Sequence, residues 1–126
     1  MKISHIVLTA LLLSVTVAPV QAANPTQVTC KAPTTNADGT PLTDLASLKL
    51  YLGKTSGAYT ITTSAPHTVI GTDEVFLISG ITGVTSGTWY VRCTATDTVG
   101  NESGYSTEIS FVLDTVTPSA PSCSVN

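Results

Sequence analysis

The segment of residues 87–103 constrains the fold of this chain most strongly, because its side chains alternate with a period of two. Apolar residues hold one set of positions and polar residues the other: Trp89, Val91, Cys93 and Ala95 against Tyr90, Arg92, Thr94 and Thr96. Successive side chains of a β-strand point to opposite faces, so the alternation predicts a strand with one buried and one solvated face. A Gly-Asn-Glu-Ser turn at residues 100–103 ends it. Other parts of the chain must cover the buried face.

The same reasoning predicts five more strands, at residues 27–31, 48–52, 59–63, 74–78 and 105–113. Their inward side chains are expected to be Val28, Cys30, Leu48, Leu50, Leu52, Phe76 and Ile78, while Ile109, Phe111 and Leu113 share one face of the last strand. Residues 59–63 are expected to form an edge strand that Pro66 terminates. The sequence shows no helical periodicity and no internal repeat, which favours an all-β fold.

Residues 1–22 have the pattern of a secretory signal peptide. Lys2 gives a positive start, an apolar run follows at residues 6–18, and Val-Gln-Ala at residues 20–22 fits a cleavage site. A retained membrane anchor is the alternative, but the run is shorter than the ~20 apolar residues that a spanning helix needs. We therefore expect a secreted or periplasmic protein whose remaining residues form one domain.

Charge and cysteine content narrow the function classes. The chain has a formal net charge of −3, and its cations beyond the leader do not cluster, which argues against a nucleic-acid surface. These cations are Lys31, Lys49, Lys54 and Arg92. Cys30, Cys93 and Cys123 all lie in the part that we expect to be exported, so one disulfide and one leftover cysteine are expected.

Reactive side chains are few beyond the leader. His67 lies in a proline-containing turn and is interpreted as an exposed loop histidine rather than a catalytic base. The carboxylates are interpreted as solvated turn residues. Calcium at Asp38 and Asp97 is disfavoured because the spacing matches no EF-hand loop, and zinc because the cysteines are far apart. We therefore expect no enzyme activity, no metal and no cofactor.

Three tyrosines are candidates for a binding surface. Tyr51, Tyr90 and Tyr105 are expected on solvated sheet faces, where they would form an aromatic platform for a sugar or peptide if their strands are neighbours. Tyrosine is also common on the solvated face of any sheet. Both interpretations stay open at this stage.

Four stretches of the sequence resemble a fibronectin type III domain of the bacterial kind. They are Ala-Pro-Thr-Thr-Asn-Ala-Asp-Gly-Thr at residues 32–40, Leu-Lys-Leu-Tyr-Leu-Gly at 48–53, Ser-Gly-Ala-Tyr at 56–59 and the Trp-led segment 89–103, whose Gly-Asn-Glu-Ser turn is the most specific part. The resemblance assigns residues 27–114 to an immunoglobulin-like antiparallel β-sandwich of seven strands. Here the family's first strand is short or missing, and Cys30 replaces its usual core Trp.

The resemblance also implies a disulfide and a class of function. Cys30 and Cys93 would face each other across the two sheets. Members of the family are mostly spacers and binding modules, so we expect a non-catalytic module for adhesion, spacing or assembly. The alternatives are a carbohydrate-binding accessory or small extracellular hydrolase, and a virus-encoded domain on a particle surface.

Residues 115–126 are expected to form a linker-like tail. A missing first strand would leave the sheet edge beside Val28 and Cys30 open, and an open edge recruits partner strands. The tail is long enough to reach a second copy and carries the leftover Cys123, which suggests weak self-association. The alternative is a disordered tail without a partner, because Pro118 and Pro121 weaken any strand there.

Overall fold

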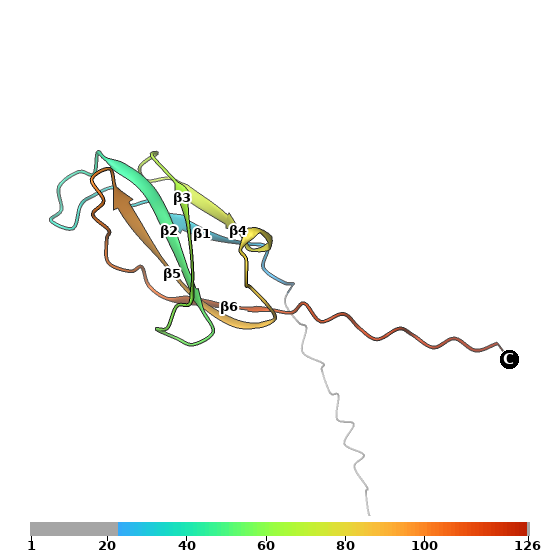
Figure 1. Cartoon of the computed structure of the whole chain (residues 1–126). Helices are drawn as coiled ribbons and strands as arrows, with labels where there is room; N and C mark the ends of the chain where they lie inside the picture. The colour runs from blue at the N-terminus through green and yellow to red at the C-terminus, as the bar shows by residue number, and fades with distance from the viewer. Residues whose placement is uncertain (1–22, 126) are drawn as a thin grey trace, which may run out of the picture.

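A computed structural model describes residues 23–125, and the predicted signal peptide lies outside the described residues. Within that range the chain forms six strands and one short helix (Figure 1): β1 (Gln27–Lys31), β2 (Leu45–Gly53), β3 (Ile61–Pro66), β4 (Asp73–Leu77), the 3-10 helix η1 (Ile78–Gly80), β5 (Gly87–Asp97) and β6 (Ile109–Leu113). None of the described residues belongs to a helix of sufficient length and apolarity to cross a membrane.

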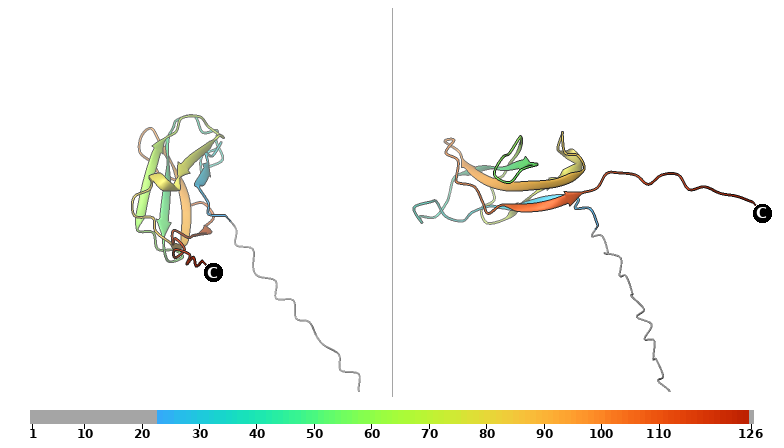
Figure 2. Two further views of the ribbon diagram at one scale, coloured as in Figure 1. Left: turned by 90° about the vertical axis from the view of Figure 1, so that its right-hand side faces the viewer. Right: turned by 90° about the horizontal axis from the view of Figure 1, so that it is seen from below.

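The strands form two antiparallel sheets, as expected for an all-β fold. One sheet has the order β1-β4 and the other the order β3-β2-β5-β6. They pack against each other as a sandwich (Figure 2), and a disulfide between Cys30 on β1 and Cys93 on β5 joins them, with their Cα atoms 6.1 Å apart. The predicted pairing of these two cysteines is confirmed.

The core lies between the sheets and is built from the predicted inward positions. Leu48, Leu50 and Leu52 of β2 are at most 1% exposed, because they alternate onto the face that β1 and β4 cover. The other predicted core residues that are buried are Val28, Cys30, Phe76, Ile78, Trp89, Val91, Ala95 and Leu113. Period-two alternation therefore identified the inner face correctly on β1, β2, β4 and β5.

The third strand differs from its prediction, at Ile61–Pro66 instead of residues 59–63. A tight turn precedes it, in which the Ala58 amide donates to the Thr55 carbonyl at 3.0 Å. A Cβ atom at Gly53 would lie 1.8 Å from the Ala58 carbonyl oxygen, so only glycine fits at this crossing. Pro66 does not terminate the strand early but is its last residue, because β3 is an edge strand and needs donors on one side only.

The last strand begins at Ile109, four residues later than predicted. Ser103 and Ser106 replace the expected ladder, because each pairs with a residue of β5 through its own amide and hydroxyl. The Ser103 amide donates to the Ala95 carbonyl at 2.8 Å, and the Ala95 amide donates back to the Ser103 hydroxyl at 2.9 Å. Ser106 makes the same pair of contacts with Cys93, both at 2.9 Å.

Both ends of the described chain leave the same end of the sandwich. The Asn24 side chain donates to the Asp114 carbonyl at 2.5 Å and accepts from the Asp114 amide at 2.9 Å. Beyond Asp114 the chain is extended and exposed and points away from the domain (Figure 1). No strand precedes β1 within residues 23–125.

Candidate functional site

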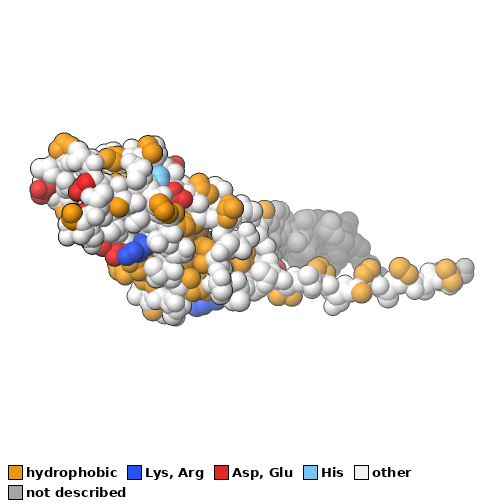
Figure 3. All heavy atoms as spheres, turned by 45° about the horizontal axis from the view of Figure 1, so that its top comes forward, with side chains coloured by type: hydrophobic (Ala, Val, Ile, Leu, Met, Phe, Trp, Pro, Cys, Tyr) orange, Lys and Arg blue, Asp and Glu red, His pale blue; other side chains and the backbone are white. Residues whose placement is uncertain are grey.

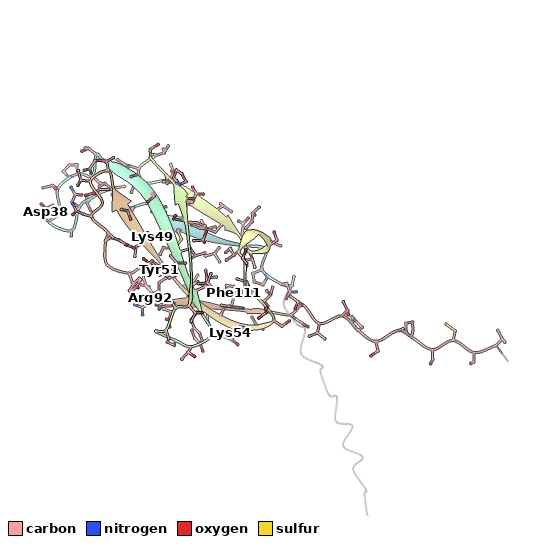
Figure 4. The ribbon with its side chains drawn as sticks, viewed as in Figure 1. Asp38, Lys49, Tyr51, Lys54, Arg92 and Phe111 are labelled. Carbon is pink, nitrogen blue, oxygen red and sulfur yellow. A yellow bond between two sulfur atoms is a disulfide. The ribbon has the colours of Figure 1, made fainter. Side chains whose placement is uncertain are left out.

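Three tyrosines and an arginine gather on the outer face of the four-stranded sheet, and we refer to them as the tyrosine cluster. Tyr51 comes from β2, Tyr59 from the turn before β3, Tyr105 from the segment before β6 and Arg92 from β5. Tyr51 lies opposite Arg92 in the β2–β5 register (Figure 4). The ring centroid of Tyr105 lies 5.1 Å from that of Tyr51 and 5.5 Å from that of Tyr59. Inclined rings at this spacing attract one another.

Glu102 holds one side of the cluster. Its carboxylate accepts hydrogen bonds from Lys49 Nζ at 2.7 Å and from the hydroxyls of Tyr51 and Thr94, each at 2.5 Å. The bond from Lys49 is the largest cause that lowers the pKa of Glu102 from its usual 4.5 to about 2. Glu102 is therefore ionised at neutral pH and orients the ring of Tyr51.

Glu108 holds the opposite side. It accepts from the Ser56 hydroxyl at 2.5 Å, from the Gly57 amide at 2.9 Å and from the Tyr59 hydroxyl. These bonds, with Ser56 first, lower the pKa of Glu108 to about 2. Arg92 Nε lies 3.7 Å from the same carboxylate. The turn that carries Tyr59 is thus fixed against the segment that leads into β6.

The cluster leaves one ring accessible, and together with Lys49, Glu102 and Glu108 it has no net charge. Tyr105 is 52% exposed, and the Arg92 guanidinium lies 5.7 Å from its ring centroid. A hollow of about 270 Å³ lies beside Tyr105, lined also by Tyr51 and Glu102. The two carboxylates are balanced by Lys49 and Arg92. Aromatic faces beside fixed polar groups suit an uncharged ligand that presents both C–H faces and hydroxyls.

The structure brings together two of the three tyrosines that the sequence singled out. Tyr51 and Tyr105 are in contact, whereas Tyr90 lies opposite Gly53 and makes no ring contact among the described residues. Tyr59 takes the third place. The Ser56-Gly57 pair was the sequence signal that could have identified Tyr59, because a turn at that point folds Tyr59 back over β2. Whether the cluster binds a ligand remains a prediction.

The interpretation of His67 as an exposed loop histidine is wrong. The ring is 9% exposed, its Nδ1 lies 2.9 Å from Glu74 Oε2, and its Nε2 lies 2.9 Å from the Val69 carbonyl oxygen and 3.0 Å from the Thr72 hydroxyl. The histidine therefore joins the end of β3 to β4, and Glu74 is not simply a solvated turn residue. Both ring nitrogens have partners within the fold.

The acidic turns are occupied by their own backbones. Asp97 Oδ1 accepts from the amides of Val99 and Asn101, and Asp38 Oδ1 accepts from the Thr40 amide and hydroxyl. Residues 23–125 contain no group of three or more histidine, cysteine, aspartate or glutamate side chains placed to hold a metal ion.

Comparison of the chain with protein-family models, with curated proteins and with solved structures finds no match in any of the three.

Proposed function

We propose that this chain is a secreted, non-catalytic immunoglobulin-like module of the fibronectin type III kind, acting in adhesion, spacing or assembly outside the cytoplasm. The tyrosine cluster carries the proposal, because a rigid aromatic site on a sheet face suits binding better than turnover. The disulfide supports export, since such bonds persist in oxidising compartments. The strand order, β1-β4 against β3-β2-β5-β6, is compatible with the proposed family if its first strand is missing.

Adhesion through a neutral sugar is the form of this function that the cluster favours. The exposed face of Tyr105 would stack on the C–H face of a sugar ring, and Arg92 would donate hydrogen bonds to its hydroxyls. Glu102 and Glu108 would hold the site in place rather than contact the ligand, since other side chains already occupy their oxygens. A carbohydrate-binding accessory is thus the second candidate, and it uses the same surface.

Binding of the mature domain to a panel of neutral and charged glycans tests the proposal. Replacing Tyr105 by alanine is expected to weaken neutral-glycan binding about fivefold or more, because truncation of an aromatic residue at the centre of a binding site costs about 1 kcal/mol or more. Tyr90→Ala is the matched control, because Tyr90 lies on the same sheet but outside the cluster. Equal loss in both variants would contradict the assignment of the site.

A broad hydrolase screen on the same protein separates the module from the enzyme alternative. We expect no turnover, because both nitrogens of His67 have structural partners. Turnover that His67→Ala abolishes in a variant that still folds, as judged by circular dichroism, would overturn the non-catalytic proposal.

A further inference from the structure

Among residues 23–125, β1 pairs only with β4, and its other edge faces the side of the sandwich where β6 lies. The Cys30–Cys93 disulfide places β1 over β5. β4 pairs with the other side of β1 and lies toward β3, because Glu74 of β4 contacts His67 at the end of β3. The unpaired amides and carbonyls of β1 are therefore directed to the space opposite β6. Such an edge is a template for another strand.

Apolar side chains on the inner face of β6 are uncovered beside this edge. Ile109 lies opposite Val91 in the β5–β6 register, so both side chains share one face, yet Val91 is 1% exposed and Ile109 is 57% exposed. Phe111, opposite the buried Trp89, is only partly buried. The inner face of β6 extends beyond the cover that the two-stranded sheet supplies, and a strand added to β1 would lie over it.

The tail of the chain has the pattern that this edge requires. Residues 115–125 carry no charge and no glycine, and apolar side chains are spaced along them (Figure 3). Pro118 and Pro121 belong to the first part, whereas residues 122–125 contain no proline. In those four residues Cys123 and Val125 alternate with Ser122 and Ser124, which gives a short strand one apolar and one polar face.

We propose that residues 122–125 of one copy add as a strand to the free edge of β1 in a second copy. Cys123 and Val125 would face inward over Ile109 and Phe111. Four residues span about 13 Å of the roughly 17 Å of β1, and the seven residues before them provide a tether of about 23 Å. The inference rests on the assembly role within the proposed function and needs no ligand at the tyrosine cluster.

A second copy is the expected acceptor because of the way the tail leaves its own domain. The paired bonds between Asn24 and Asp114 and the bond from the Thr115 amide to the Ser86 hydroxyl at 2.9 Å fix the exit of the tail. Two prolines keep it extended beyond that point. Association of this head-to-tail type repeats from copy to copy and gives a series of oligomers rather than one closed dimer.

Sedimentation velocity of the mature chain, residues 23–126, over a concentration series tests whether residues 122–125 supply the added strand. All variants carry Cys123→Ala, so that disulfides between tails cannot form while the inward position stays apolar, and the chain with Cys123 is run beside them for comparison. Val125→Asp is expected to weaken association about tenfold or more, because the new charge would be buried without a partner. Ser124→Asp adds the same charge on the solvated face and is expected to change association less than about threefold. Both residues are exposed in the extended tail, so folding of the domain is not at risk.

The acceptor surface, formed by the free edge of β1 and the inner face of β6, is tested in the same way. Ile109→Asp is expected to abolish association, whereas Val112→Asp, on the opposite face of β6 and 59% exposed, is the matched control. Circular dichroism and the unfolding midpoint establish that both variants fold. If Ile109→Asp unfolds the domain, the comparison of Val125→Asp with Ser124→Asp tests the proposal on its own.

Three results would overturn the inference: a monomer at all concentrations, equal loss in Val125→Asp and Ser124→Asp, or association that occurs only when Cys123 is present. Glycan binding measured on the same variants keeps the two proposals distinguishable. A parent chain that binds glycan but stays monomeric would refute the strand addition alone, and a parent chain that associates but binds no glycan would refute the sugar-binding role alone.

Discussion

Replacing Ser103 by alanine tests whether its hydroxyl serves as a substitute for a strand carbonyl. The Ser103 hydroxyl is the acceptor for the Ala95 amide at 2.9 Å. In the variant this amide keeps its place on β5 but loses its partner. This bond is partly buried, so water replaces the lost acceptor less readily than at an exposed position. An unsatisfied buried donor costs about 1–3 kcal/mol, and we expect the free energy of unfolding to fall by that amount.

Ser106→Ala provides an internal comparison. Its hydroxyl accepts from the Cys93 amide at the same distance of 2.9 Å, but this bond is exposed to solvent. Water can replace the lost acceptor there, so the expected decrease in unfolding free energy is below about 1 kcal/mol. The two serines thus make the same contacts and differ in the burial of the amide that each one satisfies.

Urea unfolding followed by the fluorescence of Trp89, the single tryptophan of the chain, measures both effects. Ser103→Thr keeps a hydroxyl and is expected to recover most of the lost stability. Ser110→Ala, at an exposed position on β6, is the control for a serine without this role. A Ser103→Ala cost below about 0.5 kcal/mol, or a larger cost for Ser106→Ala, would refute the reasoning.

Two further outcomes are expected from the disulfide and from Glu102. Replacing Cys30 and Cys93 together by alanine should lower the unfolding free energy by about 4 kcal/mol, because the bond closes a loop across a sequence separation of 63; a urea midpoint equal to that of the parent would contradict this. Because the folded-state pKa of Glu102 is about 2 against 4.5 when unperturbed, its stabilisation is complete above about pH 4.5 and lost as pH falls toward 2. Glu102→Gln should therefore flatten the unfolding free energy over that interval, and an unchanged acid slope would show that other groups determine it.

The inner face of the sandwich could be predicted because alternation is a local property of the sequence. Whether Val91 is buried depends on the strand that contains it, and the pattern around residue 91 suffices to identify that strand. The positions at which strands begin and end were harder to predict. The strand predicted at residues 105–113 starts late because the Ser106 hydroxyl accepts the Cys93 amide in place of a strand carbonyl, and no periodicity distinguishes such a serine from an ordinary strand residue.

The candidate site depended on contacts between distant residues. Tyr51 meets Arg92 through the register of β2 and β5, and Tyr59 meets Glu108 through the path of two separate loops. Sequence patterns could therefore nominate tyrosines but could not choose Tyr59 over Tyr90. His67 was misread for the same reason, because its partner Glu74 lies across a turn and on another strand.

The hydrogen bonds between Asn24 and Asp114 have a mechanical consequence. They fix the chain before β1 and the chain after β6 side by side at one pole of the sandwich. A tension applied between these two chain segments would load this pair of contacts first. The domain would then open from that pole instead of stretching along its length. The disulfide lies further inside and would stay unloaded until the pole had parted. A pull on the tail would therefore load the contacts of Asn24 with Asp114 before it reached the Cys30–Cys93 disulfide.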